Sequence, residues 1–334
     1  MNTKIIVGNS GFAELEQEWD ALLALSMTDT PFQRLAYQRA WWAHLQPPDS
    51  ELLIITTRND FGQLIGIGCF FISAGIIHFN GCIEETDYLD LISPADEAAA
   101  VWRSSLEALV SESTAGWHTI DLCNIPAHSP TREILPQVAK DYNWHLDESR
   151  IEVCPTINLP ESFEAYLNSL ESKQRRELSR KLRRAEGADV QTTVLYSTDE
   201  IQAEVDSFLD LLQMSTFEKR DWLNDGRRAV FHDVAKAAQE GGYLQLMFTA
   251  VEGRRAAALF NFDYNDRIWV YNSGLDPTAF SALSPGVVLT ATAIEEAIKL
   301  GRSEFDFLRG DEEYKYRFGA VDRNIYRIRM ERSV

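Results

Sequence analysis

The chain has 334 residues, of which 45% are hydrophobic and 25% charged, and its formal net charge at pH 7 is −19. This length and composition are typical of a globular protein with two domains and exclude a largely disordered or fibrous chain. The acidic excess argues against broad binding to DNA or anionic lipid, because such binding depends on basic side chains that meet phosphates. We therefore expect no DNA partner.

The cysteines and the first residues indicate a compartment. Cys69, Cys82, Cys123 and Cys154 lie far apart with no C-x-x-C pair, a pattern typical of reduced thiols. The opening MNTKIIVGNS lacks the basic and apolar regions of a secretory signal. The longest apolar run, residues 64–79, is shorter than the ~20 residues of a bilayer span. The sequence thus predicts a reduced, cytoplasmic protein without a transmembrane segment.

The first half of the chain is predicted to be mixed α/β. Amphipathic patterns indicate helices over residues 12–23 and 33–44. Alternating and apolar runs then predict three strands, a further helix and a last strand, at residues 51–60, 63–73, 75–81, 96–112 and 118–126.

A similar order restarts near residue 155, where we place a domain boundary. The expected helices span residues 162–186, 199–219, 227–239 and 285–300, and the expected strands span residues 243–252, 255–264, 267–274 and 303–308. Both halves offer helices, an antiparallel meander, another helix and one more strand. We therefore predict two duplicated domains, 1–155 and 156–334, each a mixed, mostly antiparallel sheet flanked by helices.

The stretch SALSPGVVLTATAIEEAIKLG, residues 281–301, follows a predicted strand and begins a helix. Ser284 suits the N-cap and Pro285 the first helical position, while Gly301 suits the C-terminal end. Unpaired amides and the helix dipole at such a junction favour an anion. A well-capped helix without a ligand explains the same residues.

The stretch KQRRELSRKLRR, residues 173–184, carries seven basic residues and one acidic residue. On a helix Lys173, Arg176, Arg180 and Arg184 recur every three or four positions and form one stripe. Such a stripe suits a phosphate-bearing ligand, and a solvated face paired with acidic neighbours is the alternative.

The rest of the chain offers few further candidate sites. Asp87 and Tyr88 follow the third strand of the first domain and would line a substrate cleft if the two domains faced each other, although a polar strand edge also explains them. The six histidines are scattered without a metal-binding motif, so no metal is expected. Neither a G-x-S-x-G motif nor a P-loop occurs.

The stretch SEFDFLRGDEEYKYRFG, residues 303–319, completes a larger pattern. The order of strand meander, S-P-G loop, helix and F-D-F-L-R-G-D-E-E-Y-K-Y-R-F-G resembles the GNAT superfamily of acyltransferases. The similarity is to its two-domain branch, which includes CelD-like cellulose-biosynthesis acetyltransferases and is related to Fem-type peptidoglycan aminoacyl ligases. The basic helix and the following F-E-K-R-D-W resemble the helical lead-in of that branch. The resemblance covers residues 156–320 well and residues 1–155 more loosely.

This resemblance implies a co-substrate, acetyl-CoA or another acyl-CoA, whose pantetheine arm lies along the strand before the S-P-G loop. Strand amides near Tyr271 and Asn272 would polarise the thioester carbonyl. The residues implied to bind phosphate are Ser281, Ser284, Gly286 and Val287, with Arg176 and Arg180 from the basic helix. Classical members read Q/R-x-x-G-x-G/A in this loop, and only Gly286 matches that pattern.

The resemblance also implies catalytic roles. Tyr314 stands where a tyrosine often protonates the leaving sulfur, and Asp306 is the candidate for the base or for orienting the nucleophile. A carboxylate that caps a turn is the alternative for Asp306. Lys315, with Asp87 and Tyr88, is expected to bind the acceptor.

The function expected from this resemblance is N- or O-acyl transfer to a sugar or peptidic amine or hydroxyl, within exopolysaccharide or envelope synthesis. A Fem-type ligase that uses charged tRNA is one alternative, in which the basic helix would contact the phosphate backbone. The net charge of −19 argues against it. A non-catalytic binding or scaffold protein is the other alternative.

Overall fold

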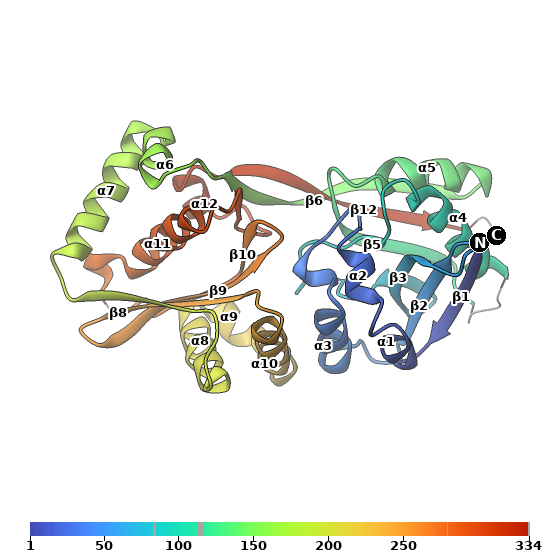
Figure 1. Cartoon of the computed structure of the whole chain (residues 1–334), viewed down its shortest axis with the longest axis horizontal. Helices are drawn as coiled ribbons and strands as arrows, with labels where there is room; N and C mark the ends of the chain where they lie inside the picture. The colour runs from blue at the N-terminus through green and yellow to red at the C-terminus, as the bar shows by residue number, and fades with distance from the viewer. Residues whose placement is uncertain (83–84, 112–115, 279, 333–334) are drawn as a thin grey trace. The chain divides into compact units, whose positions relative to one another are not determined.

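The computed structural model describes residues 1–82, 85–111, 116–278 and 280–332 and divides into two compact units (Figure 1). Unit 1 consists of Met1–Glu152 and Arg323–Val334, and unit 2 consists of Val153–Asp322. Each unit is a mixed, mostly antiparallel sheet flanked by helices, which confirms the predicted fold class.

The sheet of unit 1 has the strand order β1-β2-β3-β4-β5-β12. Its strands are β1 Asn2–Val7, β2 Glu51–Arg58, β3 Leu64–Ser73, β4 Ile76–Phe79, β5 Thr119–Pro126 and β12 Val321–Glu331. The pairs β1–β2, β2–β3, β3–β4 and β5–β12 are antiparallel, and β4 pairs with β5 in parallel. Its helices are α1 Ser10–Glu14, α2 Trp19–Leu23, η1 Pro31–Gln33, α3 Leu35–Leu45, α4 Ala98–Ser111 and α5 Thr131–Asp141.

The central strands of unit 1 follow from their sequences. β3 and β5 are apolar and buried over nearly their whole length, as expected for strands covered on both faces. α4 places Val101, Trp102 and Leu106 in the same core at helical spacing.

The sheet of unit 2 has the strand order β6-β11-β10-β9-β8-β7. Its strands are β6 His145–Asn158, β7 Val190–Leu195, β8 Leu244–Val251, β9 Arg254–Tyr264, β10 Arg267–Leu275 and β11 Glu304–Asp306. β10 and β11 pair in parallel. The pairs β6–β11, β9–β10, β8–β9 and β7–β8 are antiparallel. Its helices are α6 Phe163–Ser169, α7 Ser172–Glu186, α8 Ile201–Ser215, α9 Phe217–Trp222, α10 Asp225–Glu240, η2 Ser281–Leu283, α11 Pro285–Lys299 and α12 Glu313–Arg317.

The helices of unit 2 cover both faces of its sheet. In Figure 1, α8 and α10 lie on one face of β8 and β9, and α11 lies on the opposite face. α11 is apolar around most of its circumference, with Leu289, Ala293 and Ile294 in the core. The meander of β8, β9 and β10 and the crossover through α11 to β11 agree with the order expected from the sequence.

Each unit completes its sheet with a strand that begins in the other unit. β6 begins at His145 in unit 1, but its residues 156–158 pair with β11 in unit 2. β12 begins at Val321 in unit 2, but its residues 325–331 pair with β5 in unit 1. β12 was not predicted from the sequence, and all residues after 155 were expected to form one domain.

Three expected helices are divided in the structure. The helix expected over residues 12–23 forms two short helices, α1 and α2. The helix expected over residues 162–186 is interrupted at Leu170, which is extended at φ −72° and ψ 150° and is buried in the core of unit 2. The helix expected over residues 199–219 is interrupted at Thr216, whose Oγ1 accepts a hydrogen bond from Lys219 N at 3.1 Å and so begins a new helix, α9.

The prediction of reduced cysteines is wrong for one pair. Cys82 and Cys123 form a disulfide with their Cα atoms 6.1 Å apart, because Cys82 follows β4 and Cys123 lies on the adjacent strand β5. Cys69 and Cys154 are free and buried. Within the described residues, no helix combines the length and apolarity needed to cross a bilayer.

A buried carboxylate links β5 to β12, and its removal gives a first test. Asp121 Oδ1 accepts from Arg327 Nε at 2.6 Å, and Asp121 Oδ2 accepts from Arg329 Nη1 at 3.1 Å. Burial alone would raise the pKa of Asp121, but Arg327, His78 and Arg329 outweigh burial and lower it. We expect Asp121→Asn to destabilise unit 1 by about 1–3 kcal/mol at pH 7.

The effect should depend on pH. Because the Asp121 pKa is lowered on folding, its contribution is complete above the unfolded value of about 4 and is lost as the pH falls through the folded-state value. Hydrogen exchange of a peptide that covers β5 measures the difference in stability between wild type and Asp121→Asn at each pH. A peptide from β8 in unit 2 is the internal control. An equal difference between wild type and variant at pH 3 and pH 7 would contradict the assignment.

Candidate functional site

β10 and β11 pair over a short stretch. Arg267–Trp269 of β10 pair with Glu304–Asp306 of β11, and the rest of β10 pairs with β9 alone. A register shift between Val270 and Asn272 marks a β-bulge at this point. Bulges re-aim side chains and end pairing, and they are common beside active sites. Beyond the paired residues, β10 therefore borders an opening rather than a neighbouring strand.

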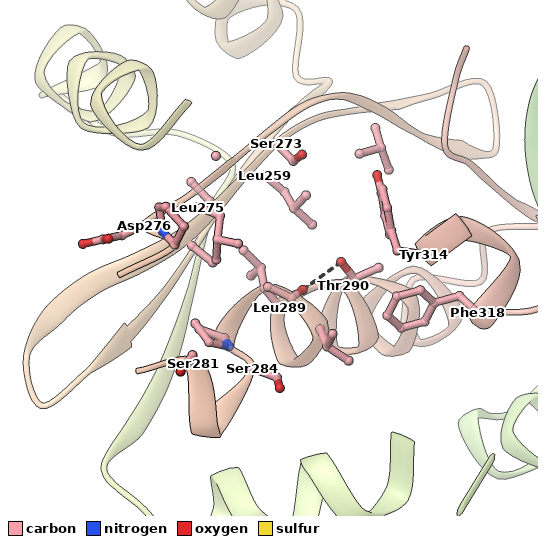
Figure 2. A pocket seen from close by; sticks show the side chains of 18 of the residues that line it. Leu259, Ser273, Leu275, Asp276, Ser281, Ser284, Leu289, Thr290, Tyr314 and Phe318 are labelled. Atoms are coloured by element: carbon pink, nitrogen blue, oxygen red, sulfur yellow. Dashed lines mark hydrogen bonds between the residues drawn. The ribbon is translucent and has the colours of Figure 1, made fainter. Parts of the chain in front are cut away.

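A cavity of about 450 Å³ lies between β9, β10 and α11. Its wall is mainly apolar, and the residues that form it include Ala257, Ala258, Leu259, Val270, Leu275, Val287, Leu289, Phe307 and Phe318. Figure 2 shows Tyr314 and Phe318 at one end and Ser281 and Ser284 at the other, with Leu289 and Thr290 of α11 between them. The shape suits an elongated ligand with an apolar body and a polar end.

The polar end of the cavity is the N-terminus of α11. Phe280 and Ser284 both adopt the left-handed conformation, with φ of 53° and 52°, which is costly for residues other than glycine. Ser284 occupies the predicted N-cap position, but its side chain forms no capping bond and lines the cavity instead. Its carbonyl oxygen accepts from Val287 N and Val288 N, at 3.0 and 3.1 Å. The Ser284 hydroxyl thus does not cap α11 and belongs to a residue of the cavity wall.

The basic helix α7 reaches this loop through a residue that the sequence did not select as a cofactor ligand. Arg184 Nη1 donates to Ala282 O at 2.9 Å and brings a positive charge to the loop before α11. Lys181 lines a second, small cavity of about 60 Å³ that also touches Tyr314. Arg176 and Arg180, which the sequence predicts to bind the cofactor, are exposed and line neither cavity.

Tyr314 projects from α12 into the cavity. Its ring meets Phe307 edge-on, with the ring centroids 6.0 Å apart. Tyr314 is 39% exposed and lines the open cavity. Burial, with the Glu312 carboxylate adding to the effect, raises the pKa of Tyr314 far above its usual value. The phenol therefore keeps its proton across the physiological range.

Asp306 and Lys315 lie beside the cavity but not in its wall. Asp306 is buried at the end of β11, where its Oδ1 accepts from Leu308 N at 2.7 Å. Leu308 has a φ of 58°, so this contact caps a strained turn. Lys315 is also buried and donates to backbone carbonyls of the same turn. The turn-capping alternative for Asp306 thus matches its contacts, and the catalytic role stays a prediction.

The bulge separates the side chains around Tyr271. Tyr271 points into an aromatic cluster, with ring centroids 5.2 Å from Phe231 and 5.2 Å from Phe262. The neighbouring Val270 and Ser273 line the cavity instead. Whatever role Tyr271 has toward a thioester would therefore come from its backbone, as the resemblance implies.

Asp87 and Tyr88 belong to unit 1, where both are buried. The cavity described above is built from unit 2 alone. Acceptor binding by these two residues stays a prediction.

Two charged groups at the site were not predicted. Asp276 lines the cavity and accepts from Thr278 N at 2.9 Å while it pairs with Arg254. Lys219 Nζ donates to Ser273 O at 2.7 Å and to Asn272 Oδ1 at 3.2 Å. Lys219 lies within the F-E-K-R-D-W segment, but nothing in that segment indicates that it folds against β10.

Glycine at position 274 allows this approach. A Cβ at Gly274 would lie 2.6 Å from Leu212 N and 2.8 Å from Leu211 C, so β10 touches the backbone of α8 here. The contact holds the end of α8, and α9 after it, against the strand that borders the cavity.

The comparisons with known proteins agree with this geometry. Residues 172–316, all in unit 2, match the family model described as an acetyltransferase (GNAT) domain. No curated protein matches the chain by sequence.

Three crystal structures are similar over nearly the whole chain. FemX has a TM-score of 0.65 at 12% identity, covering 98% of this chain and 97% of its own. The C-terminal domain of a protein described as a lysylphosphatidylglycerol synthetase, from Agrobacterium fabrum, has a TM-score of 0.61 at 10% identity, covering 95% and 91%. A conserved protein of unknown function from Bacteroides thetaiotaomicron has a TM-score of 0.60 at 15% identity, covering 98% and 100%. At such identities the similarity concerns the fold, and membership of the CelD-like branch stays a prediction.

The close packing at Gly274 gives the second test. Gly274→Ala should destabilise unit 2 by about 1–3 kcal/mol, because the new methyl group overlaps backbone atoms of α8 that cannot move independently. Gly286→Ala is the matched control, since its Cβ would meet Leu275 at 3.5 Å, an ordinary contact. Urea denaturation of both variants measures the difference. Equal stability of the two variants would show that β10 and α8 are less closely packed than described.

Proposed function

We propose that unit 2 transfers an acyl group from an acyl-CoA to an amine or hydroxyl. The observation that supports this most directly is the apolar cavity that runs from the N-terminus of α11 to Tyr314, within a segment that matches the GNAT acetyltransferase domain. A pantetheine arm has the elongated form that such a cavity accommodates, and a pyrophosphate suits the N-terminus of a fifteen-residue helix.

The residues at the α11 end fit the phosphate groups. The hydroxyls of Ser281 and Ser284 and the backbone of Gly286 and Val287 would contact the pyrophosphate, and Arg184 would supply charge. The loop has serine in place of the Q/R and of the first glycine of the classical pattern. The strained conformation of Ser284, with its hydroxyl free of a capping bond, supports a ligand-binding role for the serine that replaces one of them.

Tyr314 fits the role of general acid. When the donor is bound, its thioester supplies the activated acyl carbon, and the thiolate that leaves needs a proton. A tyrosine whose pKa is raised by burial holds its proton until the leaving group develops charge. Backbone amides at the bulge near Tyr271 and Asn272 would stabilise the oxyanion. An acceptor of the sugar or peptidic class, within exopolysaccharide or envelope synthesis, follows from the resemblance to the two-domain branch.

Aminoacyl transfer from a charged tRNA is the second candidate. The similarity of the whole chain to FemX and to a lysylphosphatidylglycerol synthetase domain supports it at the level of the fold. The exposed arginines Arg176 and Arg180 favour it as well, because a stripe that lies outside the cavity is open to a large polyanion.

Donor binding is tested by thermal unfolding with acetyl-CoA, longer acyl-CoAs and free CoA. A ligand at about 100 times its dissociation constant should stabilise the protein by about 2.7 kcal/mol. Leu275 is half-buried in the cavity wall, so Leu275→Trp should fill the cavity and abolish the shift. Leu300 follows the C-terminal end of α11, and Leu300→Trp should leave the shift unchanged. No shift with any CoA species, together with retention of aminoacyl-tRNA that Arg176→Glu and Arg180→Glu remove, would favour the second candidate.

The acid role has its own test. Tyr314→Phe should lower kcat about 100-fold, within the range of general acid catalysis, because the phenol proton is lost while the ring that packs on Phe307 remains. The thermal shift with acyl-CoA is the control and should not change. Unchanged turnover in Tyr314→Phe would show that the sulfur takes its proton from another group.

A further inference from the structure

Two lysines lie beside β10 and the segment after β11: Lys315 is buried, and Lys219 is half-buried. Lys315 Nζ donates to the carbonyl oxygens of Leu308, Arg309 and Gly310, at 3.1, 2.8 and 3.0 Å. It also lies 2.9 Å from Glu312 Oε2. Four acceptors surround the three N–H groups of an ammonium, so Lys315 is bound as part of the turn.

Lys219 is held differently. Its Nζ has two acceptors, Asn272 Oδ1 and Ser273 O, and no third partner among the residues that the structure describes. An ammonium group has three N–H donors, but a neutral amine has two and one lone pair. The neutral form therefore keeps both hydrogen bonds and presents its lone pair in the remaining direction.

The fold fixes the position of this amine. Thr216 Oγ1 accepts from the backbone N of Lys219, and Ser215 Oγ accepts from Leu275 N at 2.8 Å. With Gly274 against α8, these contacts attach the segment before Lys219 to β10 directly after the strand residues that it binds. Lys219 thus lies against Ser273, a residue of the cavity wall, and beside the bulge at Tyr271.

The charges around Lys219 favour a readily exchanged proton. Burial lowers the pKa of Lys219 to about 8, with Glu312 raising it and Lys315 lowering it. These are the charged groups that face it from the segment after β11, and β10 contributes the neutral Asn272 and Ser273. Near neutral pH a usable fraction of this amine is unprotonated, as a general base requires.

We propose that Lys219 accepts the proton of the attacking acceptor in the acyl transfer, a role that rests on the proposed function. The acceptor nitrogen or oxygen forms a bond to the acyl carbon and loses its proton to Lys219 Nζ. The carbon–sulfur bond breaks, and the sulfur takes the proton of the Tyr314 hydroxyl. Lys219 then returns a proton to solvent and Tyr314 regains one, so that both are restored. This gives Lys219 the part that the sequence suggested for Asp306, whose Oδ1 caps a turn.

Competitive labelling with acetic anhydride between pH 6 and 10, read for each lysine by mass spectrometry, tests this without turnover. Lys219 should react with a midpoint near pH 8, the exposed Lys299 serves as the internal reference for the reagent, and the enclosed Lys315 should stay unreactive. A Lys219 that never reacts, or whose reactivity shows no midpoint near pH 8, would overturn the proposal. Because no acyl-CoA is used, the result is independent of whether the donor assignment is correct.

Turnover then separates a base from a structural cation. With acetyl-CoA and hydroxylamine as the probe nucleophile, Lys219→Met should lower kcat at least about 100-fold and remove the rise in rate near pH 8. Lys219→Arg should be equally slow, because a guanidinium keeps the charge and the hydrogen bonds but does not lose its proton. Both variants should keep the thermal shift with acetyl-CoA. Rescue by arginine, or an unchanged pH profile in Lys219→Met, would make Lys219 a structural residue and overturn its role as a base.

Discussion

The parallel pairing of Arg267–Trp269 with Glu304–Asp306 determines the geometry of unit 2. It holds β10 and β11 together at one end, so that they part beyond it and leave the cavity between β10 and α11. The bulge at Tyr271 stands where the pairing ends, and it sends Tyr271 to the aromatic cluster and Ser273 to the cavity wall. The cavity is lined by β9, β10 and α11, and Phe307, which directly follows β11, completes its wall.

Lys315 and Lys219 show how contacts give one residue type two roles. Lys315 is buried and has an acceptor for every N–H, which ties the turn after β11 to the strand end. Lys219 is half-buried and has two acceptors, so deprotonation costs it no hydrogen bond. The distinction lies in the number of carbonyl oxygens that the backbone offers each amine.

Local pattern was enough to predict the meander, the crossover helix that begins at Pro285 and the mixed, mostly antiparallel fold. These depend on periodicity and on capping residues, which the sequence states directly. The role of Lys219, the contact of Arg184 with the loop before α11 and the disulfide of Cys82 were missed for a common reason. Each depends on a neighbour distant in sequence, such as Cys123 on β5, and one sequence holds no record of such proximity. The stripe of Arg176 and Arg180 was correctly placed on a helix, but its orientation was set by the packing of α7.

β6 and β12 each begin in one unit and pair in the other, and this affects the order in which the units fold during synthesis. Asp121 on β5 and Arg327 on β12 are 206 positions apart, so unit 1 lacks its last strand until almost the whole chain has left the ribosome. During that time β5 presents an unpaired edge of buried, apolar sequence, which is open to pairing with other chains. Unit 2 can complete its own sheet earlier, because β6 precedes the strands that it joins. The unit that is translated first is therefore the one whose folding finishes last.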